Sequence, residues 1–422
     1  MSSRGETQEP FSKIKPRMTE YEAVVEASRC LFCFNAPCVQ ACPTEINIPM
    51  FIRQIMSHNP KGSAKTIFTQ NILGRSCADV CPTEVLCEGS CVYLGMNKKP
   101  IEIGRLQGFA TSQAIENKIY FFHPGKSTGK RVAVVGGGPA GLACAHECAV
   151  LGHEAIVFEA SENPGGLNRY GVAPYKYSNK ESDEEVAYVS EIGFEIRTKT
   201  RVGVDIPLAE LEEKFDAIFL GVGLGLSRKI EIPGDQKKGV FGAAEFIYNL
   251  REKEQKSAVG KNVVVIGGGN TAIDAAVESA KLGASVTLVY RRTEKDMSAY
   301  NFETELARHN GVSFVFEATP VEILGEKQVS AVRFNKNPPL TLPCNQVIFA
   351  TGQEKRVDFL KQIGGLELDQ GKIKVTGDFQ TDNPKYFAGG DCVNGGKEVV
   401  NAVAHGRDAA RGIDRYFKRT SL

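Results

Sequence analysis

Eight of the twelve cysteines lie before residue 92, in two blocks whose spacing suits metal ligation. The blocks read Cys30-x2-Cys33-x4-Cys38-x3-Cys42-Pro43 and Cys77-x3-Cys81-Pro82-x4-Cys87-x3-Cys91. Disulfides are rare in reducing compartments, and zinc sites use C-x2-C pairs, of which only one exists here. Iron–sulfur ligation fits best, because in the ferredoxin run a cysteine before proline ligates the second cluster of a pair. By this rule Cys42 would ligate a different cluster from Cys30, Cys33 and Cys38. The spacing alone does not show which cysteines of the second block complete each cluster.

A dinucleotide-binding fingerprint follows in residues 131–160, RVAVVGGGPAGLACAHECAVLGHEAIVFEA. A β-branched run predicts a strand, an alanine-rich stretch predicts a helix, and AIVFE predicts a second strand. Gly136, Gly138 and Gly141 form the turn, where they allow a pyrophosphate to approach the helix N-terminus. Glu159, at the end of the second strand, is predicted to bind the ribose hydroxyls of an adenosine. The alternative is a glycine-rich turn of an α/β protein that binds no nucleotide. Such a turn would not require the flanking strands, the helix and the acidic residue, so nucleotide binding is predicted.

The same pattern recurs without a gap in residues 261–292, KNVVVIGGGNTAIDAAVESAKLGASVTLVYRR. Its predicted cofactor-binding residues are Gly267, Gly269, Asn270, Ala272, Arg291 and Arg292. Where the first copy has Glu159, the second has Tyr290 followed by the two arginines. Guanidinium groups bind a 2′-phosphate well, so this copy is predicted to accept NADPH. The alternative is a pair of solvated surface arginines.

The segment TDNPKYFAGGDCVNGGKEVVNAVAHGRDAARGI, residues 381–413, resembles the second flavin motif of two-dinucleotide-domain flavoproteins. In that class the aspartate of the GD pair binds the ribityl chain, a role that falls on Asp391. The first fingerprint then holds FAD, with Gly166 of PGGLNRYGVAPYK among its cofactor-binding residues, and the second holds NADH or NADPH. The redox C-x-x-C or C-x4-C pair of disulfide reductases does not follow the first fingerprint. Electrons are therefore expected to leave the flavin for the cysteine-rich front.

Over nearly the whole chain, the sequence resembles the small, NAD(P)H-oxidising subunit of bacterial dihydropyrimidine dehydrogenase and, less closely, the glutamate synthase small subunit. The resemblance rests on RCLFCFNAPCVQACPTEINIP, SCADVCPTEVLCEGSCVY, PIEIGRLQGFA, both glycine motifs, VYRR and AGGD. It implies two [4Fe-4S] clusters, one held by Cys30, Cys33, Cys38 and Cys91, the other by Cys42, Cys81, Cys87 and Gln107. Cys77 is left unligated in this pattern. Glutamate synthase small subunits usually carry glutamate at position 107, so Gln107 favours the pyrimidine branch.

The resemblance also implies what the chain does. In that family uracil or thymine is reduced at a separate FMN-bearing barrel, and this chain has no room for a barrel of about 250 residues. The expected function is electron input from NADH or NADPH, through FAD and two [4Fe-4S] clusters, to an FMN- and iron–sulfur-containing dihydropyrimidine dehydrogenase catalytic subunit. No catalytic side chain is expected, because hydride transfer between stacked rings needs positioning only. Alternatives are a glutamate synthase small subunit, a stand-alone NAD(P)H oxidoreductase feeding ferredoxin or another acceptor, and a non-enzymatic iron–sulfur scaffold.

The elements that position these residues are expected in an α/β chain of two or three domains. An N-terminal helical double-[4Fe-4S] domain (1–125) precedes two Rossmann-like dinucleotide-binding domains. The NAD(P)-binding domain (236–340) is inserted in the FAD-binding domain (126–235 and 341–422). A net charge of +1 gives no reason to expect nucleic acid as a partner. The chain has neither an apolar run of about 18 residues nor a signal peptide, so no membrane association and a cytoplasmic location are expected.

Overall fold

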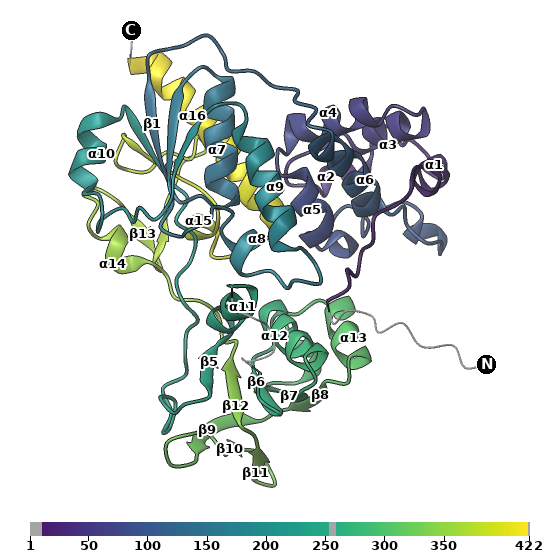
Figure 1. Ribbon diagram of the computed structural model, residues 1–422, viewed down its shortest axis with the longest axis vertical. Helices are drawn as coiled ribbons and strands as arrows, with labels where there is room; N and C mark the ends of the chain where they lie inside the picture. Colours follow the sequence, from purple (N-terminus) through teal and green to yellow (C-terminus); the bar gives the residue numbers. More distant parts are fainter. Residues whose placement is uncertain (1–10, 253–258, 421–422) are drawn as a thin grey trace. The chain divides into compact units, whose positions relative to one another are not determined.

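The computed structural model describes residues 11–252 and 259–420, which divide into two compact units. The first unit contains residues 14–169, 176–224 and 355–420, and the second contains 11–13, 170–175 and 225–354. Figure 1 gives the elements of each. None of the helices within these ranges is both long and apolar enough to cross a membrane.

The cysteine-rich front is helical. Its elements are α1 (Glu20–Ser28), α2 (Pro37–Gln40), α3 (Ile48–Met56), α4 (Pro60–Gln70), α5 (Gly74–Val80), the 3-10 turns η1 (Thr83–Val85) and η2 (Leu94–Met96), and α6 (Ile103–Glu116). Local sequence explains where the helices start. Asn47 accepts a hydrogen bond from Met50 N at 3.2 Å at the start of α3, and Asn59 accepts one from Gly62 N at 2.9 Å at the start of α4.

A parallel five-stranded sheet follows in the same unit. Its strand order is β15 (Tyr386–Ala388), β4 (Ala217–Leu220), β1 (Arg131–Val135), β2 (Glu154–Phe158) and β3 (Glu195–Arg197). The helices around it are α7 (Pro139–Val150), α9 (Asn179–Ser190), α10 (Leu208–Lys214) and α16 (Val399–Thr420). Alternate residues of β1 face opposite sides of the sheet. Val132 and Val134 join one core with α7 and α16, whereas Ala133 and Val135 join another with α10.

Helix α16 connects this sheet to the helical front. It lies against α7, shown alongside it in Figure 1, and their approach is so close that a Cβ on Gly406 would stand 2.0 Å from the Ala140 carbonyl oxygen. On another face, Arg407 Nη1 donates hydrogen bonds to the carbonyl oxygens of Thr44 at 3.1 Å and Gln70 at 2.9 Å. One helix therefore contacts both parts that the sequence predicts to carry redox cofactors.

The inserted unit is a second parallel sheet. Its order is β5 (Val240–Gly242), β12 (Gln346–Phe349), β6 (Asn262–Ile266), β7 (Ser285–Tyr290) and β8 (Ser313–Phe316). Helices α11 (Ala243–Glu252), α12 (Asn270–Lys281) and α13 (Asn301–His309) share a core with one face. The antiparallel strands β9 (Thr319–Leu324), β10 (Ala331–Asn335) and β11 (Leu340–Pro343) pair with one another in a separate sheet.

Strand β12 belongs to the inserted unit and not to the FAD-binding part (341–422) that the sequence predicts. Residues 346–349 were assigned to the returning FAD-binding part, but they pair in parallel with β5 and β6 inside the inserted unit. The chain returns to the first unit after residue 354 rather than near 340. The physical reason is that a strand buried on both sides reads as an apolar run, which gives no sign of the sheet it joins.

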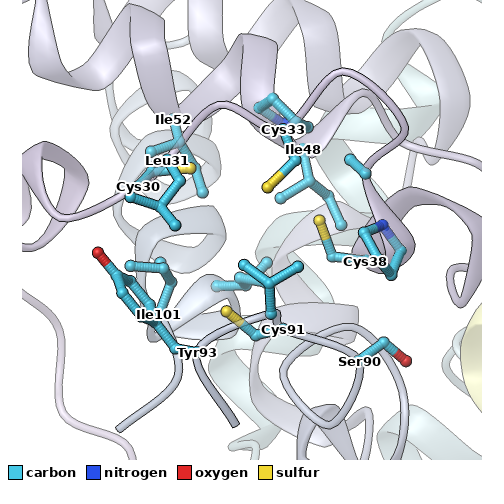
Figure 2. A pocket seen from close by; sticks show the side chains of 15 residues that line it. Cys30, Leu31, Cys33, Cys38, Ile48, Ile52, Ser90, Cys91, Tyr93 and Ile101 are labelled. Atoms are coloured by element: carbon cyan, nitrogen blue, oxygen red, sulfur yellow. The ribbon is translucent and has the colours of Figure 1, made fainter. Parts of the chain in front are cut away.

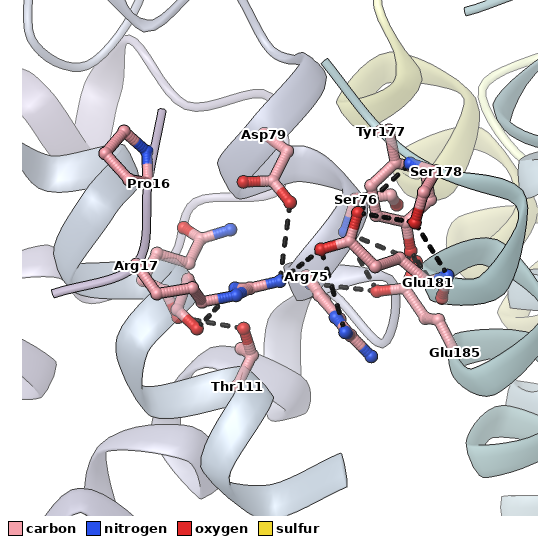
Figure 3. Close-up of polar contacts among 12 residues, drawn as sticks. Pro16, Arg17, Arg75, Ser76, Asp79, Thr111, Tyr177, Ser178, Glu181 and Glu185 are labelled. Atoms are coloured by element: carbon pink, nitrogen blue, oxygen red, sulfur yellow. Dashed lines mark hydrogen bonds and ion pairs between the residues drawn. The ribbon is translucent and has the colours of Figure 1, made fainter. Parts of the chain in front are cut away.

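A buried polar network fastens α5 to α9 within the first unit (Figure 3). The N-cap residue of α5 is Leu73, which has no polar side chain. Glu185 of α9 replaces the missing cap: its Oε1 accepts hydrogen bonds from Arg75 N at 2.8 Å and Ser76 N at 3.0 Å. Its Oε2 accepts one from Tyr177 Oη at 2.9 Å. The carboxylate is 2 % exposed, so these bonds replace water.

The N-terminal arm joins the same network. Arg17 donates to the Gly108 carbonyl oxygen at 2.8 Å and to Glu181 Oε1 at 3.0 Å, and it lies 3.5 Å from Asp79 Oδ2. A single guanidinium thereby bridges α5, α6 and α9. Helix α5, which carries Cys77, is thus held by polar contacts to both α6 and α9.

Candidate functional site

Four cysteines from both sequence blocks surround one hollow in the helical front. Cys30, Cys33, Cys38 and Cys91 line it, and Figure 2 shows their sulfur atoms distributed around the space. Their surroundings are apolar, with Ile48, Ile52 and Ile101 among the lining residues. The structure therefore brings together the four residues that the family resemblance assigned to one cluster.

The four thiols in this hollow suit a cationic ligand, because burial makes their thiolate forms costly without one. Burial raises the pKa of Cys38 to about 12, and the neighbouring thiols of Cys30 and Cys91 add to the rise. The pKa of Cys30 is also raised, by burial first and then by Cys33 and Cys91. Thiolates crowded in an apolar pocket are costly unless metal ions compensate their charge. All twelve cysteines are free thiols, so the donor set fits an iron–sulfur cluster.

A second group of cysteines consists of Cys42, Cys81 and Cys87. Burial raises the pKa of Cys87, and Glu88, Cys42 and Cys81 raise it further, so these thiols lie near one another. Cys42 is buried and its Sγ lies 3.3 Å from Thr44 Oγ1. Within the described ranges, no three or more His, Cys, Asp or Glu residues are close enough to hold a single metal ion. A four-iron cluster is larger than one ion, so that finding concerns mononuclear sites only.

Gln107 and Cys77 have different surroundings. Gln107, on α6, is 7 % exposed, and its Nε2 donates to the Gly74 carbonyl oxygen at 2.7 Å. This bond uses the Nε2 end of the amide and does not involve Oε1, the atom that could ligate a metal. Cys77 is buried on α5 and accepts a hydrogen bond from Asn71 Nδ2 at 2.9 Å. That contact already gives the Cys77 thiol a structural partner.

The first glycine fingerprint forms a tight cradle between β1 and α7. Gly136 has φ +105°, and a Cβ on Gly141 would stand 1.9 Å from the Gly136 carbonyl oxygen, so neither position accepts a side chain. Gly138 is the N-cap of α7 and leaves the first N–H groups of the helix open to an anion. Gly166 packs against it, because a Cβ there would come within 2.8 Å of Gly138 Cα. The cradle fits a pyrophosphate.

Two carboxylates flank this cradle at the sheet's carboxyl edge. Glu159, after β2, is buried and accepts hydrogen bonds from Gly137 N and Ser161 N, both at 2.7 Å. Asp391 follows β15 and begins the short helix α15 (Asp391–Asn394). Burial raises its pKa, which the backbone N–H of Lys397 at 3.4 Å counteracts. Each follows a strand of the parallel sheet, and ribose binding by Glu159 and ribityl binding by Asp391 stay predictions.

His405, on α16, supports the turn before Asp391. Its Nδ1 accepts a hydrogen bond from Gly390 N at 3.2 Å, and the Phe379 ring lies 4.8 Å from its ring. Burial lowers the pKa of His405, which keeps Nδ1 free to accept that bond. Gly390 has φ +76°, a conformation that favours glycine. His405 is not among the site residues that the sequence predicts, because a lone histidine on a helix carries no motif.

The second fingerprint forms a similar cradle between β6 and α12. A Cβ on Gly267 would stand 2.3 Å from the Ala350 carbonyl oxygen, and Gly269 is the N-cap of α12. Ala272 is fully buried, and Asn270 Oδ1 accepts a hydrogen bond from Tyr300 N at 3.0 Å. Arg291 and Arg292 directly follow β7 and are exposed. Their side chains are therefore accessible to a 2′-phosphate.

Two family models match the chain. The model described as pyridine nucleotide-disulphide oxidoreductase matches residues 130–406, and that described as dihydropyrimidine dehydrogenase domain II, 4Fe-4S cluster, matches residues 6–119. Together they confirm the predicted order of an iron–sulfur front followed by Rossmann-like domains.

Relatives of similar length match from end to end. The NAD-dependent dihydropyrimidine dehydrogenase subunit PreT of Salmonella typhimurium is 36 % identical over 409 residues, covering 97 % of each chain. The glutamate synthase [NADPH] small chain of Escherichia coli is 34 % identical, covering 97 % of this chain and 94 % of that one.

Solved structures share the fold of the dinucleotide-binding part. FprA of Mycobacterium tuberculosis in complex with NADPH superposes with a TM-score of 0.59 at 19 % identity, over 69 % of this chain and 85 % of that one. Thioredoxin reductase of T. acidophilum gives a TM-score of 0.57 at 21 % identity, over 68 % and 98 %. The α/β fold class is confirmed.

Proposed function

Since the chain belongs to the family of dihydropyrimidine dehydrogenase PreT subunits and glutamate synthase small chains, we propose that it is the electron-input subunit of a dihydropyrimidine dehydrogenase. It is an FAD- and iron–sulfur-dependent NAD(P)H oxidoreductase. The observation that carries the proposal is the convergence of Cys30, Cys33, Cys38 and Cys91 on one hollow, in the compact unit that also holds the first glycine cradle.

Each cofactor has its own residues in this proposal. One [4Fe-4S] cluster is held by Cys30, Cys33, Cys38 and Cys91, and a second by Cys42, Cys81, Cys87 and Gln107. Gly136, Gly138, Gly141, Gly166, Glu159 and Asp391 hold FAD, and Gly267, Gly269, Asn270, Ala272, Arg291 and Arg292 hold the nicotinamide nucleotide. When bound, the flavin accepts hydride from NAD(P)H and the clusters carry its two electrons away singly. The protein binds, orients and excludes water, and needs no acid or base.

The chain's partner in this proposal is an FMN- and iron–sulfur-containing subunit. Within residues 11–252 and 259–420, both five-stranded parallel sheets carry a glycine fingerprint, and no eight-stranded barrel is present. Uracil or thymine would therefore be reduced on the partner. Overall, NAD(P)H, one proton and uracil give NAD(P)⁺ and 5,6-dihydrouracil.

The composition of the purified protein tests the proposal. Anaerobically purified chain should contain about eight irons and about one FAD, and it should reduce an artificial dye with NADH or NADPH. The control is the Gly141→Val variant, whose side chain would overlap the Gly136 carbonyl oxygen and should abolish FAD binding. About two irons, or zinc, would contradict the two-cluster assignment. Absence of flavin and of dye reduction would favour a non-enzymatic iron–sulfur scaffold.

A glutamate synthase small chain is the second candidate, favoured by 34 % identity to such a chain. Gln107 favours the pyrimidine branch, because glutamate is usual at that position in glutamate synthase. Reconstitution separates the two candidates. Electron delivery to an FMN-barrel dihydropyrimidine dehydrogenase subunit, measured as uracil-dependent NADH oxidation, supports the first. Glutamine- and 2-oxoglutarate-dependent oxidation with a glutamate synthase large subunit supports the second.

A further inference from the structure

A cavity of about 230 Å³ lies in the first unit, between the helical front and the helices α7 and α9. It is lined by Ile72 between α4 and α5, by residues 120–124 after α6, by His146 of α7, and by the C-terminal end of α9 with the residues that follow it. On α7, His146 stands eight residues beyond the N-cap Gly138, about 12 Å along the helix axis. His146 therefore lies away from the pyrophosphate cradle, and none of the lining residues belongs to either cysteine block.

Aromatic rings form much of the wall of this cavity. The Tyr188 ring contacts the Phe68 ring of α4, with centroids 5.1 Å apart, and stacks on Tyr120, with centroids 5.2 Å apart and planes at 24°. Tyr188 is held in place because its Oη donates a hydrogen bond to the Ile119 carbonyl oxygen at 2.6 Å. Flat rings bind well against such surfaces, since π systems favour offset-stacked and edge-to-face contacts. The wall therefore suits a planar aromatic ligand.

His146 is a buried polar group of the cavity. Its side chain is 6 % exposed, and the Phe122 ring lies 5.2 Å from it at 90°. Burial lowers the pKa of His146 to about 4, so its imidazole is neutral at physiological pH and has one donating and one accepting nitrogen. Among residues 11–252 and 259–420, no group forms a hydrogen bond with this ring. Because buried polar atoms are normally hydrogen-bonded, the accepting nitrogen indicates a donor from outside the chain.

We propose that this cavity binds a neutral, planar aromatic molecule of one or two rings, whose N–H or O–H group donates a hydrogen bond to His146. The volume sets the size of the ligand, because a cavity of about 150 Å³ holds benzene. Four exposed lining residues mark the opening: Tyr120, His123, Pro124 and Glu191. The carboxylate of Glu191 disfavours anionic ligands there. The site is additional to those of the flavin, the nicotinamide nucleotide and the clusters, and it does not depend on the proposed function.

A bound molecule would contact two parts of the unit at once. Ile72 belongs to the helical front, whereas His146 and Tyr188 belong to helices of the FAD-binding part. A ligand that binds only the folded protein stabilises it. Occupation of the cavity should therefore raise the thermal unfolding temperature of the unit.

Equilibrium dialysis of the anaerobic holoprotein with indole tests the proposal. Indole is neutral, has two fused rings and carries one N–H donor. The chain contains no tryptophan, so extracted indole can be quantified by its own fluorescence. About one indole per chain should bind saturably. 1-Methylindole, which lacks the donor, and the anion indole-3-carboxylate are the matched probes.

Variants of the cavity identify the contacts. His146→Leu keeps an apolar side chain and removes both ring nitrogens, so it should weaken indole binding about fivefold and change 1-methylindole binding less than about twofold. His146→Gln keeps an accepting oxygen and should retain the wild-type preference between the two probes. Tyr120→Ala should weaken both probes. Tyr21→Ala, which removes an exposed tyrosine of α1 outside the cavity, is the control and should weaken neither.

Iron and flavin content establish that each variant is folded. The proposal is overturned if indole does not bind saturably, or if Tyr120→Ala leaves its binding unchanged. It is also overturned if His146→Leu weakens indole and 1-methylindole equally, because the histidine would then only shape the cavity. Binding of indole to FAD-free protein alone would place it in the flavin site and refute the proposal as well. Binding of indole-3-carboxylate as tight as that of indole would refute the preference for neutral ligands.

Discussion

At the residue scale, cysteines with the same chemistry have distinct surroundings. Cys91 faces a hollow with three other thiols, whereas Cys77 is buried and accepts a hydrogen bond from Asn71. Sequence spacing alone could not separate these two cysteines of the same block. The family resemblance could, and the contacts of Cys77 supply a physical reason for its exclusion.

Alanine substitutions should separate these two cysteines. Cys77→Ala should retain about eight irons per chain, while Cys91→Ala should lose about four. Iron analysis and the visible absorbance of anaerobic protein measure both. The opposite pattern would overturn the ligand scheme.

Two exposed arginines after β7 allow a test of nucleotide preference. The relatives are named for NAD in one case and NADPH in the other. Combined Arg291→Glu and Arg292→Glu substitution should raise the KM for NADPH at least about tenfold, a loss of about 1.4 kcal/mol, because carboxylates repel a 2′-phosphate. The KM for NADH should change little. Lys327→Glu, an exposed change in the same unit, is the control, and equal effects on both nucleotides would refute the role.

His146 makes stability depend on pH. It is 6 % exposed, edge-on to the Phe122 ring, and burial lowers its pKa to about 4. The unfolded chain, with a pKa near 6.5, binds the proton first, so stability is full above about pH 6.5 and is lost as pH falls toward 4. Between pH 7 and pH 5 the loss should be about 2 kcal/mol. Thermal unfolding of wild type and His146→Leu at both pH values should show a smaller pH effect in the variant.

At the element scale, the helix carrying Cys77 depends on a cap from a distant part of the chain. Glu185 accepts hydrogen bonds from Arg75 N, Ser76 N and Tyr177 Oη. Local sequence predicts α3 and α4 because their own asparagines cap them. It does not reveal the cap of α5, since Glu185 lies about a hundred residues away along the chain.

Removal of this cap should destabilise the front. Glu185→Ala leaves the buried backbone N–H groups of Arg75 and Ser76 without an acceptor, while Tyr177 Oη keeps the Glu181 carbonyl oxygen, and should cost about 2–4 kcal/mol. Glu185→Gln keeps one acceptor oxygen and should cost less. Thermal unfolding of the holoprotein, read together with iron content, measures the effect. Equal stability of Glu185→Ala and wild type would show that the cap is dispensable.

At the scale of the whole molecule, sequence reasoning predicted the fold class and the nested order of the two sheets. Both follow from local signals, because glycine turns and β-branched runs report their own conformation. The sheet that β12 joins and the contact of His405 with the turn before Asp391 did not follow. Those depend on the pairing of β12 with β6 and on the contact between α16 and the turn before Asp391, which no local pattern encodes.

At this scale we predict which reaction step each subunit carries out. The chain alone should oxidise NADH or NADPH with an artificial dye but should not reduce uracil. Addition of an FMN-barrel dihydropyrimidine dehydrogenase subunit should make NAD(P)H oxidation depend on uracil. Anaerobic spectrophotometry at 340 nm, together with detection of dihydrouracil, measures both. Uracil reduction by the chain alone would contradict the proposed partner.

The contacts of α16 also have a consequence for how the protein is made. The eight cysteines leave the ribosome first, but Arg407, which donates to the carbonyl oxygens of Thr44 and Gln70, follows some 300 residues later. At about 5–20 residues per second that delay is about 15–60 s. Until α16 has been synthesised, the cysteine-rich front lacks the helix that packs against it. Maturation of the second cysteine group is therefore expected after synthesis, and nascent chains would be its most oxidation-sensitive form.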